Sequence, residues 1–365
     1  MSADDLRHMK HAMSLARRGL GTVWPNPSVG CVIVKNGITV GRGHTAAGGR
    51  PHGEPQALAM AGNAAMGATA YVTLEPCSHT GKTPPCARAL IDAGIVRVVS
   101  ALEDDDPRVA GCGHKMLREA GIEVVTGICA SEAQALNEGF FRRINLGRPM
   151  LTLKLASSFD GRIATARGES QWITGPAARR NVHMERARHD AVFVGAGTAR
   201  ADDPSLNVRG LGVRQQPVRV VAARMLDIPL SSKFAQTARE IPVWIMHGPS
   251  ALREHRVAWA ACGVKLIEVA EENGTLSPLA MMQALGREGL TRVYCEGGGQ
   301  LAAALLRADM VDHISGYTAG VMLGAEGLSG LGPMGLDHLA DAPRFTLKDV
   351  KALGGDTVHS WQRES

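Results

Sequence analysis

The chain has 365 residues, which is long for a single domain and predicts two. Hydrophobic residues make up 45% and charged residues 21%, a globular balance, and without an apolar run of about 18 residues we expect no membrane-spanning segment. The net charge of +5 is mild, and a composition with only 4% aromatic residues and no Lys/Arg block argues against a nucleic-acid partner.

The N-terminal segment and the cysteines both bear on the cellular compartment. Met1 to Lys10 is polar and charged and lacks the apolar stretch of a secretion signal, so we expect a cytoplasmic protein. The chain has seven cysteines, and an odd number without an export signal argues against a disulfide framework.

The first part of the chain alternates helices and strands. Apolar residues at helical spacing predict a helix over 4–18, and Asn36-Gly37 predicts the turn of a hairpin over 29–41. A helix is expected over 55–66, with Pro55 acceptable in its first turn. Further strands are expected over 71–74, 96–102 and 122–126, and further helices over 86–93, 113–120 and 131–145. This alternation predicts a layered α/β domain.

Four residues in this part form the pattern of a zinc deaminase. His52 and Glu54 stand before a helix, and Cys77 and Cys86 each follow a proline further along. One His and two Cys can hold zinc while the fourth position stays open for water, whose pKa the metal lowers to about 7. A carboxylate that does not bind the metal, here Glu54, can then carry a proton to the leaving amine.

The alternative is a closed zinc site that only connects loops. It requires a fourth protein ligand, for which His44 and His79 are the candidates. Eight residues, Ser78 to Pro85, separate the two cysteines, more than in nucleic-acid deaminases. The polar side chains of this segment suit an anionic group of a substrate.

The second part begins after Gly147-Arg148-Pro149, where the pattern breaks, so we expect domains over 1–147 and 148–365. Strands are expected over 151–155, 191–194, 218–222, 243–246, 265–269, 292–295 and 313–317, and helices over 176–188, 277–287 and 300–307. This half is therefore also predicted to be α/β. Residues 296–300 (EGGGQ) join a strand to a helix, where glycines either let backbone N–H groups approach a phosphate or simply make a tight turn.

Four segments of the first half carry a family likeness. They are 29–34 (VGCVIV), 52–54 (HGE), 71–79 (YVTLEPCSH) and 82–86 (KTPPC). Together they resemble the bifunctional riboflavin-biosynthesis deaminase/reductase family, which implies a cytidine-deaminase-like α/β/α domain. The resemblance implies zinc on His52, Cys77 and Cys86, with Glu54 as the proton shuttle. Members more often have Ala and Val where this chain has Gly53 and Pro55, and neither position binds metal.

Substrate contacts are expected at Asn26, His44, His79 and Lys82, with a solvated loop as the alternative for Lys82.

The second half resembles the reductase half of the same family. The likeness lies in 154–156 (KLA), 158–162 (SFDGR), 168–174 (GESQWIT), 197–198 (GT), 201–206 (ADDPSL) and 296–298 (EGG). It implies a fold like dihydrofolate reductase and the cofactor NADPH. The residues implied to line the cofactor are Ala156, Trp172, Thr198, Asp202, Gly298 and Gly299. Those implied to hold the substrate are Ser170, Arg186, Leu206, Arg209 and Glu296.

Two arginines of this set suit a phosphorylated substrate, because the guanidinium groups of Arg186 and Arg209 can grip a phosphate by forked hydrogen bonds. The proton donor for the sugar oxygen is not evident. Lys154 is one candidate, and a salt-bridged structural lysine is the equal alternative.

The resulting hypothesis is a bifunctional enzyme acting on small phosphorylated pyrimidines. It performs a zinc-dependent hydrolytic deamination of 2,5-diamino-6-(5-phosphoribosylamino)pyrimidin-4-one and then an NADPH-dependent reduction of the ribose moiety to ribityl. We expect a homodimer or higher homo-oligomer. The rivals are a nucleic-acid deaminase, which requires a basic, aromatic-rich surface, and a zinc-stapled nucleotide sensor, which requires four protein ligands.

Overall fold

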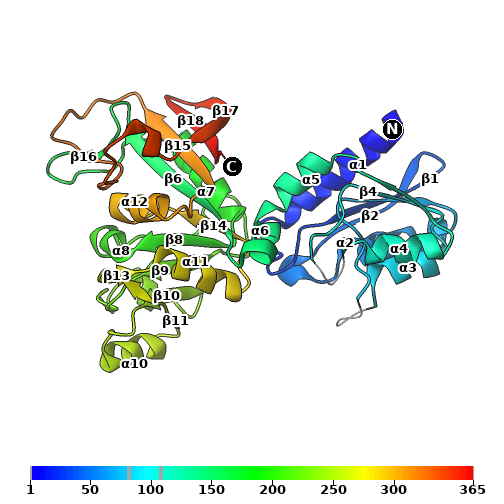
Figure 1. The fold of residues 1–365 in the computed structure, drawn as a ribbon, viewed down its shortest axis with the longest axis horizontal. Coiled ribbons are helices and arrows are strands. Elements are labelled where there is room, and N and C mark those ends of the chain that lie inside the picture. Colours follow the sequence, from blue (N-terminus) through cyan, green and yellow to red (C-terminus); the bar gives the residue numbers. More distant parts are fainter. Residues whose placement is uncertain (1, 80–83, 107–109, 365) are drawn as a thin grey trace. The chain divides into compact units, whose positions relative to one another are not determined.

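The computed structural model describes residues 2–79, 84–106 and 110–364 and contains two compact units, Met1–Gly147 and Arg148–Ser365. Both units are mixed α/β, as the sequence predicts (Figure 1). Within the described ranges, no helix combines the length and apolar character needed to cross a membrane.

Unit 1 is built on a five-stranded sheet with the strand order β2-β1-β3-β4-β5. Its strands are β1 (Gly30–Lys35), β2 (Ile38–His44), β3 (Thr69–Val72), β4 (Arg97–Ser100) and β5 (Glu123–Thr126). The predicted hairpin is present, since β1 is antiparallel to β2. β1 is also antiparallel to β3, whereas β3, β4 and β5 are parallel, as expected where helices connect strands.

Helices cover both faces of this sheet. They are α1 (Ala3–Ala16), α2 (Gly53–Ala61), α3 (Cys86–Asp92), α4 (Cys112–Glu119), α5 (Ala130–Leu136) and α6 (Glu138–Leu146). One buried cluster joins Met9 and Met13 of α1 to Val32 and Tyr71, and another joins Ala57 of α2 to the opposite sheet face. This arrangement is the α/β/α sandwich that the family resemblance implies.

The single helix predicted over 131–145 is wrong, because the segment forms two helices with a break at Asn137. The Asn137 side chain accepts a hydrogen bond from Ser28 N at 2.8 Å and donates one to Ser28 O at 3.2 Å. Its backbone sits at φ −102° and ψ 15°, outside the helical region. A distant backbone contact therefore interrupts a sequence with good helical periodicity.

Unit 2 is built on a nine-stranded sheet with the order β11-β10-β9-β8-β14-β6-β15-β18-β17. These strands are β6 (Met150–Ser158), β8 (Ala191–Gly195), β9 (Val218–Ala222), β10 (Val243–His247), β11 (Lys265–Glu268), β14 (Arg292–Cys295), β15 (His313–Ala319), β17 (Phe345–Leu353) and β18 (Asp356–Arg363). Short strands outside this sheet are β7 (Arg162–Ala164), β12 (Glu271–Glu272), β13 (Thr275–Leu276) and β16 (Leu328–Ser329). The strands from β11 to β15 run parallel, so their carboxyl ends share one edge.

The helices of unit 2 are α7 (Pro176–Ala187), α8 (Ala196–Asp202), α9 (Lys233–Gln236), α10 (Arg253–Ala261), α11 (Pro278–Arg287) and α12 (Gly299–Arg307). All seven predicted strands and all three predicted helices of this half are present. The sequence prediction missed the β17–β18 hairpin at the end of the sheet (Figure 1). The residues of β17 are mostly exposed on both faces, so they lack the alternation that marks a half-buried strand.

Candidate functional site

Three predicted metal ligands come together in unit 1. His52 directly precedes α2, Cys86 is the first residue of α3, and Cys77 lies in the loop that follows β3. Their ligand atoms all lie within 4.8 Å of one another. The two helix starts and the strand end thus bring together residues separated by up to 34 positions.

The spacing of these atoms fits zinc. His52 Nδ1 lies 3.2 Å from Cys86 Sγ and 3.7 Å from Cys77 Sγ. A tetrahedral ion with bonds of about 2.0 Å to nitrogen and about 2.3 Å to sulfur separates such atoms by about 3.5 Å. Among the described residues, no fourth His, Cys, Asp or Glu joins the group. The donor set therefore matches an open site with a position for water rather than a closed structural site.

The electrostatic environment favours a thiolate at Cys77. Hydrogen bonding from the Cys86 thiol outweighs burial and, with His52 beside it, lowers the pKa of Cys77 to about 4. The same contact with Cys77 raises the pKa of His52, despite the opposing effect of burial. A thiolate is the form of cysteine that binds zinc, so Cys77 is already in its metal-binding form near neutral pH, whereas its hydrogen bond with Cys77, together with burial, raises the pKa of the Cys86 thiol.

Glu54 lies in the first turn of α2 and is only 3% exposed. The helix begins at Gly53, earlier than the predicted residue 55, so Glu54 is fixed by helical backbone. Its Oε2 is buried and finds no hydrogen-bond partner among the described residues, and burial raises the pKa of the carboxyl group. A buried polar atom without a partner is rare and suits a group that exchanges protons with a ligand.

The other predicted deaminase contacts have different surroundings. The Asn26 amide donates to Gly49 O at 2.9 Å, which joins two loops, and His44 Nδ1 lies 2.9 Å from Thr45 O. His79 Nδ1 is buried without a partner among the described residues, which leaves it free to contact a ligand. Lys82 lies outside the described residues.

The candidate site of unit 2 lies at the carboxyl edge of the parallel strands. Glu296 follows β14 and forms a forked ion pair with Arg186 of α7, with Arg186 Nη2 2.9 Å from Glu296 Oε2. Arg186 Nη1 also donates to Asn207 O at 2.9 Å. Burial opposes ionisation of Glu296, but Arg186 outweighs it and lowers the pKa of the carboxyl group. These bonds occupy the Arg186 fork, whereas Arg209, the other arginine predicted to bind the substrate, is exposed.

Lys154 of β6 belongs to the same neighbourhood. Burial lowers the pKa of its ammonium group, while the charges of Glu296 and Asp202 act in the opposite direction and Arg186 adds to the lowering. A lysine whose charged form is disfavoured can release a proton more readily than an exposed one.

The residues predicted to line the cofactor lie on several elements of unit 2. Thr198 Oγ1 accepts a hydrogen bond from Gly298 N at 3.0 Å, which links the starts of α8 and α12. Trp172 is 67% exposed, and the Arg179 guanidinium lies 4.6 Å from its ring centroid. The remaining predicted residues of this unit are Ala156, Ser170 and Gly299, which are half-buried, Asp202, which is exposed, and Leu206, whose side chain is buried in the core.

Two residues of these sites were not assigned a role from the sequence. Asn207 supplies the carbonyl that fixes Arg186, and backbone groups leave no residue-type signal. Glu75 is a buried carboxylate beside the Cys77 loop, only 3% exposed. Its signal was present in the sequence, since an acidic residue follows an apolar strand and precedes Pro76-Cys77.

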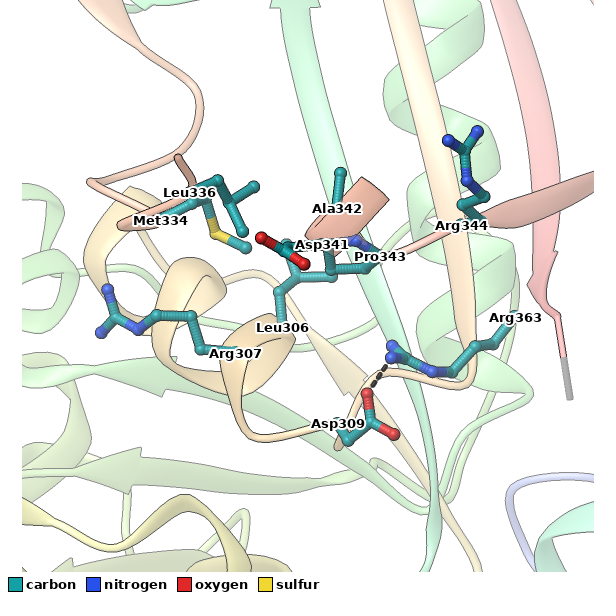
Figure 2. Close-up of a pocket in the computed structure, with 10 residues that line it drawn as sticks. All are labelled: Leu306, Arg307, Asp309, Met334, Leu336, Asp341, Ala342, Pro343, Arg344 and Arg363. Atoms are coloured by element: carbon teal, nitrogen blue, oxygen red, sulfur yellow. Dashed lines mark hydrogen bonds and ion pairs between the residues drawn. The ribbon is translucent and has the colours of Figure 1, made fainter. Parts of the chain in front are cut away.

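A cavity of about 340 Å³ lies elsewhere in unit 2 and contains none of the predicted site residues. Figure 2 shows Arg363 turned toward Asp309, whereas Arg307 and Arg344 point away from one another. The guanidinium groups therefore do not converge on a common point, as a phosphate site would require.

Asp104, near the Cys77 loop in unit 1, provides a pH test of stability. Burial raises the pKa of Asp104 to about 6, so the native state holds its proton more tightly than the unfolded chain. Protonated Asp104 therefore contributes free energy of unfolding that is fully present below about pH 4 and is lost as the pH rises through about 6. Asp104→Asn keeps an acceptor for Asp106 N and should stabilise the protein by about 1–3 kcal/mol at pH 8, with little effect at pH 4. Thermal unfolding at both pH values checks this, and the exposed Asp105→Asn is the control. An equal shift at both pH values would contradict the prediction.

Comparisons with known proteins cover both units. Residues 2–102 match the cytidine and deoxycytidylate deaminase zinc-binding region, and residues 149–359 match the RibD C-terminal domain. The riboflavin biosynthesis protein RibD of Escherichia coli strain K12 is 43% identical over 358 residues, covering 96% of this chain and 97% of that relative. The Aquifex aeolicus protein of the same name is 39% identical, with 98% of each chain covered.

Solved structures agree with this result. Acinetobacter baumannii RibD, form 1, has a TM-score of 0.89 and 40% identity, with 99% of each chain covered. The Thermotoga maritima diaminohydroxyphosphoribosylaminopyrimidine deaminase/5-amino-6-(5-phosphoribosylamino)uracil reductase has a TM-score of 0.86 and 33% identity, again with 99% of each chain covered. The prediction of the family from sequence motifs is confirmed. The chain belongs to the family of bifunctional riboflavin-biosynthesis enzymes that join a zinc-dependent deaminase to an NADPH-dependent reductase.

Proposed function

We propose that residues 1–147 deaminate 2,5-diamino-6-(5-phosphoribosylamino)pyrimidin-4-one and that residues 148–365 then reduce the ribose moiety of the product to a ribityl chain. The observation that carries the proposal is the group of His52, Cys77 and Cys86 beside the unpartnered carboxylate oxygen of Glu54. Three ligands and a buried base are the parts that hydrolytic deamination needs.

In the deaminase step, His52, Cys77 and Cys86 would hold zinc. When bound, the metal supplies a Lewis acid that makes a water molecule acidic enough to lose a proton near pH 7. Glu54 Oε2 takes that proton as the water oxygen attacks the amino-bearing ring carbon, and the carboxyl group then gives the proton to the amino nitrogen. The C–N bond breaks, ammonia leaves and a carbonyl remains. The raised pKa of Glu54 helps the carboxyl group to hold the proton between these two transfers. Asn26, His44, His79 and Lys82 are assigned to the phosphoribosyl pyrimidine.

In the reductase step, bound NADPH would be the source of the hydride for the sugar carbon. We assign the cofactor to Ala156, Trp172, Thr198, Asp202, Gly298 and Gly299. We assign the substrate to Ser170, Arg186, Leu206, Arg209 and Glu296. The ion pair between Arg186 and Glu296 holds both side chains in fixed positions for substrate binding. Arg209 contacts the phosphate, and Lys154 donates the proton that the sugar oxygen requires.

The proposal is tested by incubating the zinc-loaded chain with the diaminopyrimidine phosphate, with and without NADPH. Ammonia should appear in both samples, whereas NADPH absorbance should fall only after ammonia has begun to form. Ammonia release that requires NADPH, or NADPH oxidation without ammonia, would contradict two successive steps in this order.

We also propose a cytoplasmic homodimer. Seven free cysteines, two of them assigned to zinc, suit a reducing compartment. The edge strand β17 pairs only with β18 on one side and exposes Leu347 and Val350, at 46% and 53%, so its free backbone groups can pair with a second copy. Light scattering at several protein concentrations tests the dimer, and a monomeric mass throughout would refute it.

A further inference from the structure

Glu75 makes an unusual set of contacts for a buried carboxylate. Its Oε1 accepts hydrogen bonds from Gly113 N at 2.7 Å and His114 N at 3.0 Å, the first turn of α4. Its Oε2 accepts from Gly111 N at 2.9 Å and Asp104 N at 3.2 Å. A carboxylate offers about four acceptor positions, so backbone N–H groups occupy all of them.

These contacts exclude a metal-binding role for Glu75. Its oxygens do lie near His114 and Glu103, in a group with the spacing of metal ligands. However, a carboxylate whose acceptor positions are all filled by N–H donors has no lone pair left for an ion. The charge is instead stabilised by the backbone donors and by the N-terminal end of the α4 dipole.

Glu75 also lies at the centre of the structure that surrounds the Cys77 ligand. From the α4 side, a Cβ atom on Gly113 would lie 1.9 Å from Pro76 O, so the helix backbone contacts the loop directly. From the α3 side, Ala87 N donates to Cys77 O at 3.2 Å and Cys86 N donates to Cys77 Sγ at 3.4 Å. The loop is thus held between the starts of two neighbouring helices (Figure 1).

We propose that Glu75 is a positioning residue for the deaminase: by binding the start of α4, it fixes the Pro76-Cys77 turn so that the Cys77 thiolate keeps the geometry required for the metal. α3 holds the other side of the turn through its own backbone. Without Glu75, the loop loses its hydrogen bonds to α4 and keeps those to α3, so the Cys77 ligand gains freedom. The inference rests on the proposed zinc ligands.

The test uses Glu75→Gln in the full zinc-loaded chain. Gln keeps the size of the side chain but turns an amide NH2 toward backbone N–H groups. Zinc release to a chromophoric chelator should become about 10–100-fold faster, the usual effect of losing a residue that orients a metal ligand. The thiolate-to-metal absorption of the Co²⁺-substituted protein should weaken, and ammonia release should fall at least tenfold while reductase activity is retained.

Asp5→Asn is the matched control, because Asp5 is also buried and pairs with Arg97 and Tyr71 without touching the Cys77 loop. It should lower the melting temperature without changing zinc release. Gly113→Ala keeps the Glu75 side chain, but its methyl group would lie 1.9 Å from Pro76 O and 3.1 Å from Glu75 Oε1. It therefore disturbs the same contact from the α4 side, should also accelerate zinc release, and serves as the second variant if Glu75→Gln does not fold.

The outcomes distinguish the zinc ligands from the positioning role of Glu75. Wild-type protein without a thiolate-to-Co²⁺ band would refute the proposed zinc ligands themselves. A normal wild-type band, combined with wild-type zinc release in Glu75→Gln and Gly113→Ala, would refute only the positioning role. Equal acceleration in Asp5→Asn at the same loss of melting temperature would reduce the role of Glu75 to general stability.

Discussion

Replacing Glu54 by Gln is expected to lower ammonia release by about 10³-fold while zinc stays bound, since general acid–base catalysis contributes about 10²–10⁴-fold. Gln fits the same buried space in the first turn of α2, but it cannot accept and return a proton. The ligands His52, Cys77 and Cys86 are unchanged, so metal content should remain at one zinc per chain.

The measurement combines an ammonia assay with metal analysis of the same sample. Reductase activity, assayed with the deaminated pyrimidine, serves as an internal control because it belongs to the other unit. Glu119→Gln is a second control, since Glu119 lies on the exposed part of α4. Normal deamination by Glu54→Gln would remove Glu54 from the proton path, and loss of zinc would make it a ligand or a structural support.

The grouping of the proposed metal ligands was predictable from the sequence because each residue carries a chemical signal. A His and a Glu at one helix start, a Pro-Cys pair after a strand and a second Pro-Cys pair at another helix start have few purposes together, and the structure brings the ligand atoms of the His and both Cys within 4.8 Å. The position of Glu54 inside α2, rather than before it, was not predictable. Pro55 marked the expected start of the helix, but helical backbone begins at Gly53.

The reductase site was less predictable because its geometry depends on contacts between distant segments. Arg186 and Glu296 are separated by 110 positions, and no local pattern indicates that they form a pair. The sequence suggested that Arg186 was free to grip phosphate, whereas its guanidinium is already engaged by Glu296 and Asn207 O. Likewise, the break at Asn137 depends on Ser28, far away along the chain. Local periodicity and propensity contain no information on such partners.

Glu296→Gln should reduce the kcat/KM of the reductase by about 10²-fold or more, without affecting ammonia release. A hundredfold loss of kcat/KM corresponds to about 2.7 kcal/mol of lost transition-state stabilisation, since about 1.4 kcal/mol is a factor of ten, and we expect it because Gln no longer holds the Arg186 guanidinium in place. Arg186 has only 12% of its side chain exposed, so its charge would be left with a neutral partner in a poorly solvated place. The Gln amide would also direct N–H groups toward the guanidinium donors.

A matched control is needed because any buried carboxylate in this sheet also affects stability. Asp190 is buried just before β8 and accepts hydrogen bonds from Thr291 N at 2.6 Å and Arg292 N at 2.9 Å, at the opposite end of the strands from Glu296. Asp190→Asn should lower the melting temperature but leave kcat/KM close to wild type at temperatures where the protein is folded. If it loses as much activity as Glu296→Gln, the pair acts through stability. If Glu296→Gln reduces its substrate normally, the Arg186–Glu296 pair lies outside the substrate site, and the phosphate and sugar contacts must come from other residues at the carboxyl edge of the sheet.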